Sequence, residues 1–273
     1  MPQKLYNSFL GRCTLKILTA PAVSKTAGLF MNSVLSKPFI SFFIKKNGID
    51  MSEYKVENWS CFNEFFTRRI KSGKRKICID SDSLISPCDG YLTVYNIDKD
   101  SKFEIKNSIY SITELTQNPD IENEYNGGLC LVFRLTPSDY HRYIYPDTGA
   151  KGKNTHIKGV FHTVRPVAFE RYPVFKTNSR EYTILRTNNF DDVVFMEVGA
   201  MMVGRICNYH EEHNFRRGEE KGKFEFGGST IIMIIKNDTA IINDEISKAN
   251  TRGEEFKVKL GEKIGCKKNK TTF

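Results

Sequence analysis

A serine preceded by two glycines stands directly before the most apolar run of the chain. The stretch reads Gly227-Gly228-Ser229-Thr230 and is followed by five apolar residues at 231–235. With little steric hindrance at Gly228, the Ser229 hydroxyl could attack its own preceding carbonyl, and strain in that peptide bond would assist. The chain has no GxSxG frame, P-loop or dinucleotide fingerprint. The pattern therefore disfavours a hydrolase nucleophile elbow and the common nucleotide-binding motifs.

Two histidines lie in segments that could supply an acid or a base. His141 is flanked by two tyrosines and Arg142, and these neighbours could hold its ring in one tautomer near neutral pH. His162 falls on the apolar face of an expected strand, where a histidine is commonly a satisfied core residue. A structural and a catalytic role stay open for both residues.

An aspartate and an arginine complete the set of candidate residues. Asp89 lies in the turn Ser-Pro-Cys-Asp-Gly at 86–90, where Pro87 fixes φ and Gly90 tolerates unusual dihedral angles. Such turns also occur with no chemical role. Arg180 opens a β-type run and could bind a phosphate or carboxylate through two parallel hydrogen bonds.

Short β-type runs separated by turns must position these residues. The expected strands are 91–97, 128–135, 160–164, 182–186, 193–198, 201–206 and 231–235. The last run is rich in β-branched residues and too short to cross a membrane, so it predicts a strand buried on both faces.

The N-terminal part has a different pattern. Residues 1 to about 75 show helical spacing of apolar and aromatic residues with basic flanks. One helix is expected from Ser60 or Asn63 through Ile70, with Arg68 on its remaining basic face. Packing onto the body and docking on a membrane surface both fit this pattern. We predict an α+β fold, with a helical region at 1–75 packed on a mainly β body at 76–273.

Composition narrows the class of protein. The 273 residues carry 41 Lys+Arg against 32 Asp+Glu, a net charge of +9, which favours anionic partners as readily as an ordinary basic surface. No apolar stretch approaches the roughly 20 residues of a spanning helix. The seven cysteines are scattered and form no CxxC pair, which predicts reduced thiols in a cytosolic setting and neither a disulfide framework nor a zinc site.

Taken in order, seven segments resemble the phosphatidylserine decarboxylase proenzymes, a family of pyruvoyl-dependent enzymes. They are 62–68 (FNEFFTR), 86–90 (SPCDG), 135–142 (LTPSDYHR), 163–166 (TVRP), 178–180 (NSR), 198–206 (VGAMMVGRI) and 221–230 (KGKFEFGGST). The resemblance covers roughly residues 60 to 236. Each segment alone is weak evidence, whereas the ordered set is highly specific.

The resemblance implies a use for the glycine–serine junction. Ser229 would attack the carbonyl of Gly228 to form an ester, and β-elimination would release a β chain (1–228) and an α chain (229–273). Residue 229 would then carry a pyruvoyl group as the only cofactor, with no metal and no diffusible cofactor. This group would accept electrons while phosphatidylserine loses CO₂ to give phosphatidylethanolamine.

The resemblance also assigns roles, with one departure. Asp89 would belong to an Asp/His/Ser relay that drives cleavage. Many members carry a His-Arg-x-His stretch, and here the second histidine is replaced by Ile144. Either His141 takes both duties, or His162 reaches the site as the relay base, and His141 is favoured for protonating the substrate. Arg142 and Arg180 are expected to bind the substrate.

A diacyl lipid substrate implies peripheral attachment to an anionic membrane surface, expected at the cytoplasmic face. The resemblance further implies a homodimer of αβ units, and no nucleic-acid partner is expected. Two alternatives remain open. One is a pyruvoyl decarboxylase of a soluble amino acid, and the other is a non-enzymatic β binding module with an inert Gly228–Ser229 bond.

Overall fold

Strand β14, Ser229–Ile235, is the central strand of the protein, and every residue in it is buried. The computed structural model describes residues 20–100, 102–105, 108–160, 162, 173–199, 205–226 and 229–268. β14 pairs antiparallel with β10 (Asp192–Gly199) on one side and with β5 (Leu129–Leu135) on the other. The predicted strand at 231–235 is confirmed, and it begins two residues earlier, at Ser229.

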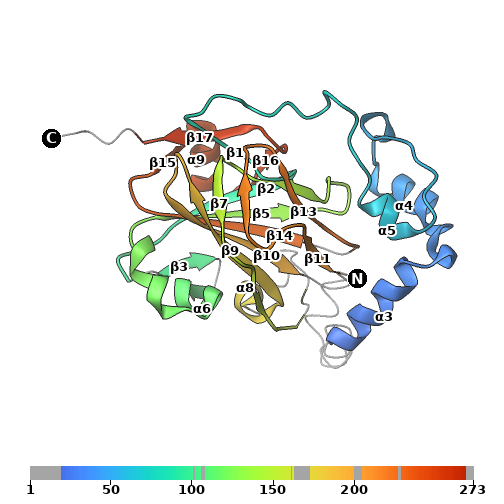
Figure 1. The fold of residues 1–273 in the computed structure, drawn as a ribbon, viewed down its shortest axis with the longest axis horizontal. Helices are drawn as coiled ribbons and strands as arrows, with labels where there is room; N and C mark the ends of the chain where they lie inside the picture. Colours follow the sequence, from blue (N-terminus) through green and yellow to red (C-terminus); the bar gives the residue numbers. More distant parts are fainter. Residues whose placement is uncertain are drawn as a thin grey trace.

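β14 belongs to a nine-stranded sheet (Figure 1). The strand order is β12-β7-β9-β10-β14-β5-β2-β16, and β8 also pairs with β9. The further strands are β2 (Gly90–Asn96), β7 (Gly149–Lys151), β8 (Thr155–Ile157), β9 (Arg180–Thr187), β12 (His213–Phe215) and β16 (Phe256–Val258). Four other predicted strands, 91–97, 128–135, 182–186 and 193–198, thus appear as β2, β5, β9 and β10. The predicted runs 160–164 and 201–206 lie mostly outside the described residues.

Two apolar clusters cover the two faces of this sheet. One, here the α6 face, contacts β3 (Lys102–Ile105), β4 (Ser108–Ser111), α6 (Ile112–Thr116), η3 (Pro119–Tyr125) and α8 (Val174–Thr177). The other, the β13 face, contacts β11 (Ile206–Asn208), β13 (Glu220–Phe224), β6 (Arg142–Ile144), β1 (Ser83–Ile85), β17 (Lys263–Lys267), β15 (Ala240–Ile242) and α9 (Asp244–Thr251). Figure 1 shows α6 and β3 on one side of the sheet and β17 and α9 on the other.

The N-terminal helices lie together beside the β body (Figure 1). They are α3 (Pro21–Met31), η1 (Val34–Ser36), α4 (Phe39–Asn47), η2 (Met51–Glu53) and α5 (Phe62–Phe66). A third apolar cluster joins α4 and α5 to Ile85, Tyr140, Ile144 and Leu260 of the body. The sequence at 1–19, part of the expected helical region, lies outside the described residues.

The helix expected to continue through Ile70 is wrong in its length. α5 ends at Phe66, and Ile70 instead forms an antiparallel bridge with Tyr54. Arg68 was expected on a basic exposed face, yet it is buried, with its guanidinium 4.1 Å from the centre of the Tyr54 ring. Stacking on an aromatic face lets an arginine enter the interior.

The predicted α+β class with a mainly β body is confirmed. The boundary near residue 75 stays a prediction, because the third cluster joins both sides of it. None of the helices in the described ranges is long and apolar enough to cross a membrane.

Candidate active site

One end of the nine-stranded sheet brings the candidate residues together. Ser229 pairs with Gly199 of β10 and with Leu135 of β5. Tyr91 pairs with Arg134, so the preceding residue, Gly90, lies beside Leu135. A Cβ on Gly90 would lie 2.8 Å from the Arg134 carbonyl oxygen, so only glycine allows this approach. The Asp89 turn, which leads into β2, and Ser229, which begins β14, therefore lie at the same end of the neighbouring strands β2, β5 and β14.

Ser229 is fully buried at the start of β14. Residues paired directly across strands share a face, so its side chain lies on the β13 face, with Ile231 and Leu135. Its Oγ has no hydrogen-bond partner among the described residues. A buried hydroxyl without a partner costs stability, and a serine retained in that state suits a reactive role. Gly228, the other half of the expected cleavage site, lies outside the described residues.

His141 is held as a neutral base just before β6. Its Nδ1 lies 2.9 Å from the Asp139 carbonyl oxygen, which can only accept, so Nδ1 carries the proton. The opposite nitrogen, Nε2, is buried with no hydrogen-bond partner in the described part of the chain. Burial first, and then the positive charge of Arg68, lower the pKa of His141 to about 3. At neutral pH this imidazole accepts a proton and has none to donate from Nε2.

Aromatic packing places His141 near the segment that leads into β14. Its ring centre lies 4.0 Å from that of Phe66, and Phe66 in turn packs against Phe226, three residues before Ser229. The His141 carbonyl also accepts a hydrogen bond from the backbone of Phe224 at 2.9 Å.

His162 is tied to the same end of the sheet through Asn178. The Asn178 side chain accepts from the His162 backbone N–H at 2.9 Å and donates to the His162 and Gly199 carbonyls, both at 2.8 Å. Gly199 is the residue paired with Ser229. Burial lowers the pKa of His162, so it too is neutral near pH 7. The structure therefore leaves both histidines as candidate bases.

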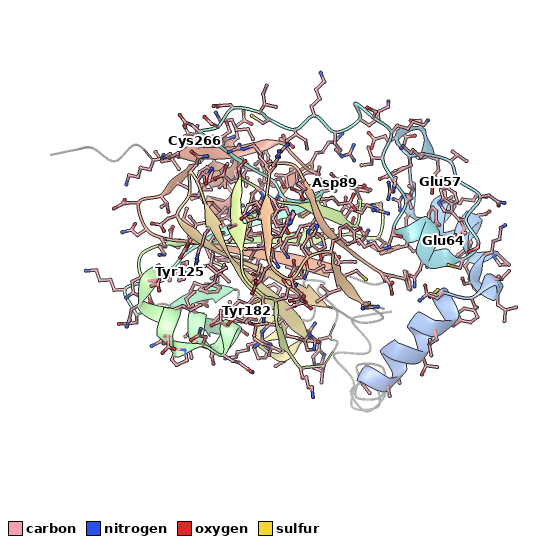
Figure 2. The ribbon with its side chains drawn as sticks, in the orientation of Figure 1. Glu57, Glu64, Asp89, Tyr125, Tyr182 and Cys266 are labelled. Carbon is pink, nitrogen blue, oxygen red and sulfur yellow. The ribbon has the colours of Figure 1, made fainter. Side chains whose placement is uncertain are left out.

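Asp89 is engaged by an arginine that sequence reasoning did not select. Arg75 donates to both carboxylate oxygens, at 2.9 Å from Nε and 2.6 Å from Nη2, and the Leu260 backbone N–H donates at 2.8 Å. Three of the roughly four lone-pair sites of the carboxylate are thus occupied. Arg75 also pairs with Glu53 at 3.0 Å. Figure 2 shows Asp89 on the side of the β body nearer Glu57 and Glu64.

A small cavity of about 190 Å³ lies beside this ion pair. It is lined by Arg75, Arg142, Ile144 and Leu260, among other residues. Ile144, the departure from the two-histidine pattern, is buried and contributes only methyl and methylene groups there. Arg142 donates to the Thr67 carbonyl at 2.8 Å and pairs with Glu220 at 2.5 Å. Of the two candidate substrate-binding arginines, Arg142 is the one that borders this cavity.

Arg180 is placed differently. It is buried, and its guanidinium donates to four backbone carbonyls, those of Glu114, Leu115, Lys176 and Asn178, at 2.7–3.0 Å. These contacts fix α6 and α8 against β9, next to Asn178. The expected role of Arg180 in substrate binding stays a prediction.

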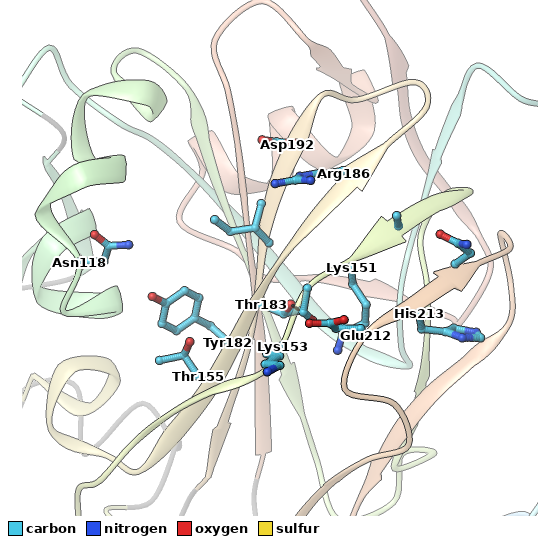
Figure 3. Close-up of a pocket in the computed structure, with 14 residues that line it drawn as sticks. Asn118, Lys151, Lys153, Thr155, Tyr182, Thr183, Arg186, Asp192, Glu212 and His213 are labelled. Atoms are coloured by element: carbon cyan, nitrogen blue, oxygen red, sulfur yellow. Dashed lines mark hydrogen bonds between the residues drawn. The ribbon is translucent and has the colours of Figure 1, made fainter.

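A larger hollow, of about 930 Å³, lies elsewhere (Figure 3). It opens beside β7 and β9 and is lined by 14 residues, most of them polar, including Lys151, Tyr182 and Arg186. None of the candidate catalytic residues lines it. Its size alone does not make it the active site.

The fold and the site define a mixed α+β protein in which a buried serine opens the central strand of a mainly β body. A family model described as phosphatidylserine decarboxylase matches residues 62–266. The chain is 45% identical over 262 residues to phosphatidylserine decarboxylase proenzyme 2 of Clostridium acetobutylicum, covering 96% of this chain and 90% of the relative. It is 41% identical over 269 residues to phosphatidylserine decarboxylase proenzyme of Clostridium botulinum (strain 657 / Type Ba4), covering 96% and 91%. A Ruminiclostridium cellulolyticum protein of the same name is 42% identical over 267 residues, covering 96% and 89%.

These matches agree with the seven segments that carry the resemblance in the sequence. The chain belongs to the phosphatidylserine decarboxylase family.

Proposed function

We propose that this chain is a proenzyme that cuts itself between Gly228 and Ser229 and then decarboxylates phosphatidylserine to phosphatidylethanolamine. The observation that carries the proposal is the buried Ser229 hydroxyl, which lacks a hydrogen-bond partner in the described structure, in a chain of this family. The strand pairs on both sides fix its backbone. Among the described residues, the hydroxyl therefore has no hydrogen bond to break before it attacks.

His141 is the base that the site supports best. A neutral ring with its proton fixed on Nδ1 presents the Nε2 lone pair, which is the form needed to take the Ser229 hydroxyl proton. His162 remains the alternative, because Asn178 joins its backbone to the residue beside Ser229. Asp89 would orient a histidine only through its remaining lone-pair site, so its principal contact in the uncut chain is Arg75.

Ser229 also suits the cofactor that the resemblance implies. A pyruvoyl group at residue 229 would supply an electron sink for the carbon–carbon bond cleavage. The apolar side chains of Leu135 and Ile231 on the same face exclude water from this position. In this proposal His141 would return to the substrate the proton that its Nε2 accepts, and Arg142, which borders the cavity, would bind an anionic headgroup.

The direct test is a mass spectrum of the purified protein under denaturing conditions. The proposal expects two chains, with the smaller one, 229–273, lighter by one ammonia than a chain that begins with serine. Carbonyl-trapping reagents should block conversion of phosphatidylserine in the same preparation. A single intact chain of 31.4 kDa with an ordinary serine at 229 would contradict the proposal and favour a binding module.

In this proposal the N-terminal helices contact the membrane surface. Six large apolar side chains there are 41–75% exposed, namely Leu29, Phe30, Val34, Leu35, Phe39 and Phe42. Lys37, Lys45 and Lys46 lie in the same segment. Apolar groups can enter the headgroup zone while each lysine contributes about 1 kcal/mol near anionic lipid. We propose peripheral attachment to the cytoplasmic leaflet, with a homodimer of αβ units as the assembly.

Vesicle flotation tests the membrane contact. Replacing Leu35 and Phe42 together by Asp should abolish flotation with phosphatidylserine vesicles and leave turnover of detergent-dispersed substrate intact. Ile79→Asp is the matched control, because Ile79 is 91% exposed and lies outside these helices. Equal flotation of the double variant and the control would exclude this surface. Turnover of a soluble amino acid in preference to the lipid would support the alternative enzyme.

A further inference from the structure

Two histidines and a glutamate gather on the loops around β12, away from the candidate active site. His210 follows β11, His213 is the first residue of β12, and Glu219 directly precedes β13. One nitrogen or oxygen atom from each lies within 4.8 Å of the others. All three side chains are half-buried. Figure 3 shows His213 at the margin of the large hollow, beyond Lys151.

The surrounding contacts fix the three side chains. β12 pairs with β7, and β13 pairs with β6 and β11, so the connection from β12 to β13, which carries Glu219, is held at both ends. The second carboxylate oxygen of Glu219 accepts from the Arg216 N–H at 3.0 Å. The Tyr145 hydroxyl lies 3.3 Å from His210 Nδ1, and Lys151 donates to the His210 carbonyl at 2.9 Å.

We propose that His210, His213 and Glu219 bind a divalent transition-metal ion, with Zn²⁺ as the best match. Two imidazoles and one carboxylate form a recurring zinc ligand set that leaves a fourth position for water. The carboxylate offsets part of the charge of the ion, and Tyr145 gives His210 an outer-shell partner of the kind that orients metal-binding histidines.

The geometry needs only side-chain adjustment to admit the ion. His213 Nε2 lies 2.6 Å from Glu219 Oε1, whereas neighbouring ligands around tetrahedral zinc are about 3.3 Å apart, given bonds of about 2.0 Å. The two imidazole rings are stacked at 3.8 Å and must tilt to aim at one point. Both side chains are partly exposed, so neither movement disturbs the core.

The proposed ion lies apart from the candidate catalytic residues, because Ser229, His141 and Asp89 are not among its ligands. It would link the loop after β11 to the start of β12, an edge strand of the nine-stranded sheet, and to the residue before β13 of the β11-β13-β6 sheet. This proposal departs from two expectations: the resemblance implied no metal, and the scattered cysteines predicted no zinc site. The spacing of the cysteines carries no information about this cluster, which contains only histidines and a glutamate.

Calorimetric titration of chelator-treated protein with ZnCl₂ tests the site. One ion per chain should bind, and His210→Ala, His213→Ala and Glu219→Gln should each weaken binding at least about 100-fold, since loss of an outer-shell partner alone costs 10- to 100-fold. His156→Ala is the matched control, because His156 is an exposed histidine on β8 beside Glu181 and outside the cluster. It should bind zinc like the wild type.

Thermal unfolding gives a second readout that does not depend on activity. Zinc should raise the Tm of the wild type and of His156→Ala, and should leave the Tm of the three ligand variants unchanged. Their metal-free Tm values show whether each variant folds. Failure of the wild type to bind zinc overturns the proposal. Unchanged affinity in the three variants overturns it too, because the ion would then lie on other residues, such as the cysteines.

Discussion

Two polar clusters at the same end of the nine-stranded sheet differ in how their hydrogen bonds are used. Around Asp89, the carboxylate accepts three hydrogen bonds, and its partner Arg75 also pairs with Glu53. Around Ser229, the serine Oγ and the His141 Nε2 are equally buried, and neither has a partner within the described ranges. The two clusters are two strands apart in the sheet. Ser229 of β14 pairs with Leu135 of β5, and Leu135 lies beside Gly90 of β2, the residue after Asp89.

We infer from this difference that the Asp89 cluster is mainly structural and that the Ser229 cluster is the reactive one. A buried carboxylate with an arginine and a backbone N–H gains its stability from those contacts, and removing one is costly. The Ser229 hydroxyl and the neutral His141 ring are buried without hydrogen-bond partners in the described structure, so the folded state already bears the cost of burying them. A proton transfer between them would break no hydrogen bond seen among the described residues. The comparison predicts which variants lose chemistry and which lose stability.

The largest expected effect is on Ser229. Ser229→Ala should abolish cleavage and leave one 31.4 kDa chain on a denaturing gel. Thr230→Ala is the matched control, because its hydroxyl is also buried and without a partner in the described structure, but points to the α6 face. The Thr230→Ala chain should still be cleaved between Gly228 and Ser229. Cleavage of Ser229→Ala, or failure of both variants, would remove the distinction between the two hydroxyls.

The next effect separates the two histidines. His141→Gln should slow cleavage roughly 10²- to 10⁴-fold, the usual contribution of a positioned base. His162→Ala should split at close to the wild-type rate, followed as the loss of intact chain after rapid refolding or cell-free synthesis. The reverse order of rates would assign the base to His162.

Arg75 should affect stability more than chemistry. Arg75→Ala leaves the nearly buried Asp89 carboxylate without its cation and should lower the free energy of unfolding of uncut Ser229→Ala protein by about 3 kcal/mol. Arg252→Ala is the control, because it breaks an ion pair of similar geometry to Glu254 that is exposed on both sides. It should leave the urea midpoint unchanged. Equal effects of the two variants would contradict a structural role for the buried pair.

The smallest effect is the pH dependence that His141 contributes. Its pKa is about 3 in the folded chain and about 6.5 when unfolded. Between these values the unfolded chain binds a proton that the folded chain does not, so stability falls as the pH falls. Uncut Ser229→Ala protein should lose about 2 kcal/mol from this histidine between pH 7 and pH 5. Adding His141→Gln should remove that part of the loss in urea titrations, and an unchanged pH dependence would show that the ring is not buried and neutral.

The long central strands of the nine-stranded sheet could be predicted from the sequence because they are apolar runs. The runs 231–235 and 193–198 are rich in apolar and β-branched residues, and both form strands buried on both faces. Three-residue strands such as β6 and β11 carry no such period, and they form because β13 pairs with both. The expected end of the helix at Ile70 failed because the Tyr54 bridge and the buried Arg68 depend on distant residues.

The sequence identified candidate residues for the site but not the residues that support them. Ser229, Asp89 and the histidines stand in recognisable segments, and their roles stay predictions. Asn178 stands in the segment 178–180, where the sequence suggests no role for it. In the structure its side chain joins the backbones of His162 and Gly199. Arg75 stands in a basic stretch, Lys74-Arg75-Lys76, where only the fold distinguishes it from its exposed neighbours. Partners this far apart along the chain need the three-dimensional structure.

The central position of β14 constrains how the protein can unfold and refold after a cut before residue 229. The new chain end would begin a strand that has six residue pairs with β10 and seven with β5, so the short fragment could not leave without tearing the sheet open. Once heat or urea had separated the two pieces, reassembly would require one polypeptide to thread between two strands of another. The mature protein would therefore keep its shape through a barrier to opening, and a melted sample would not recover on cooling.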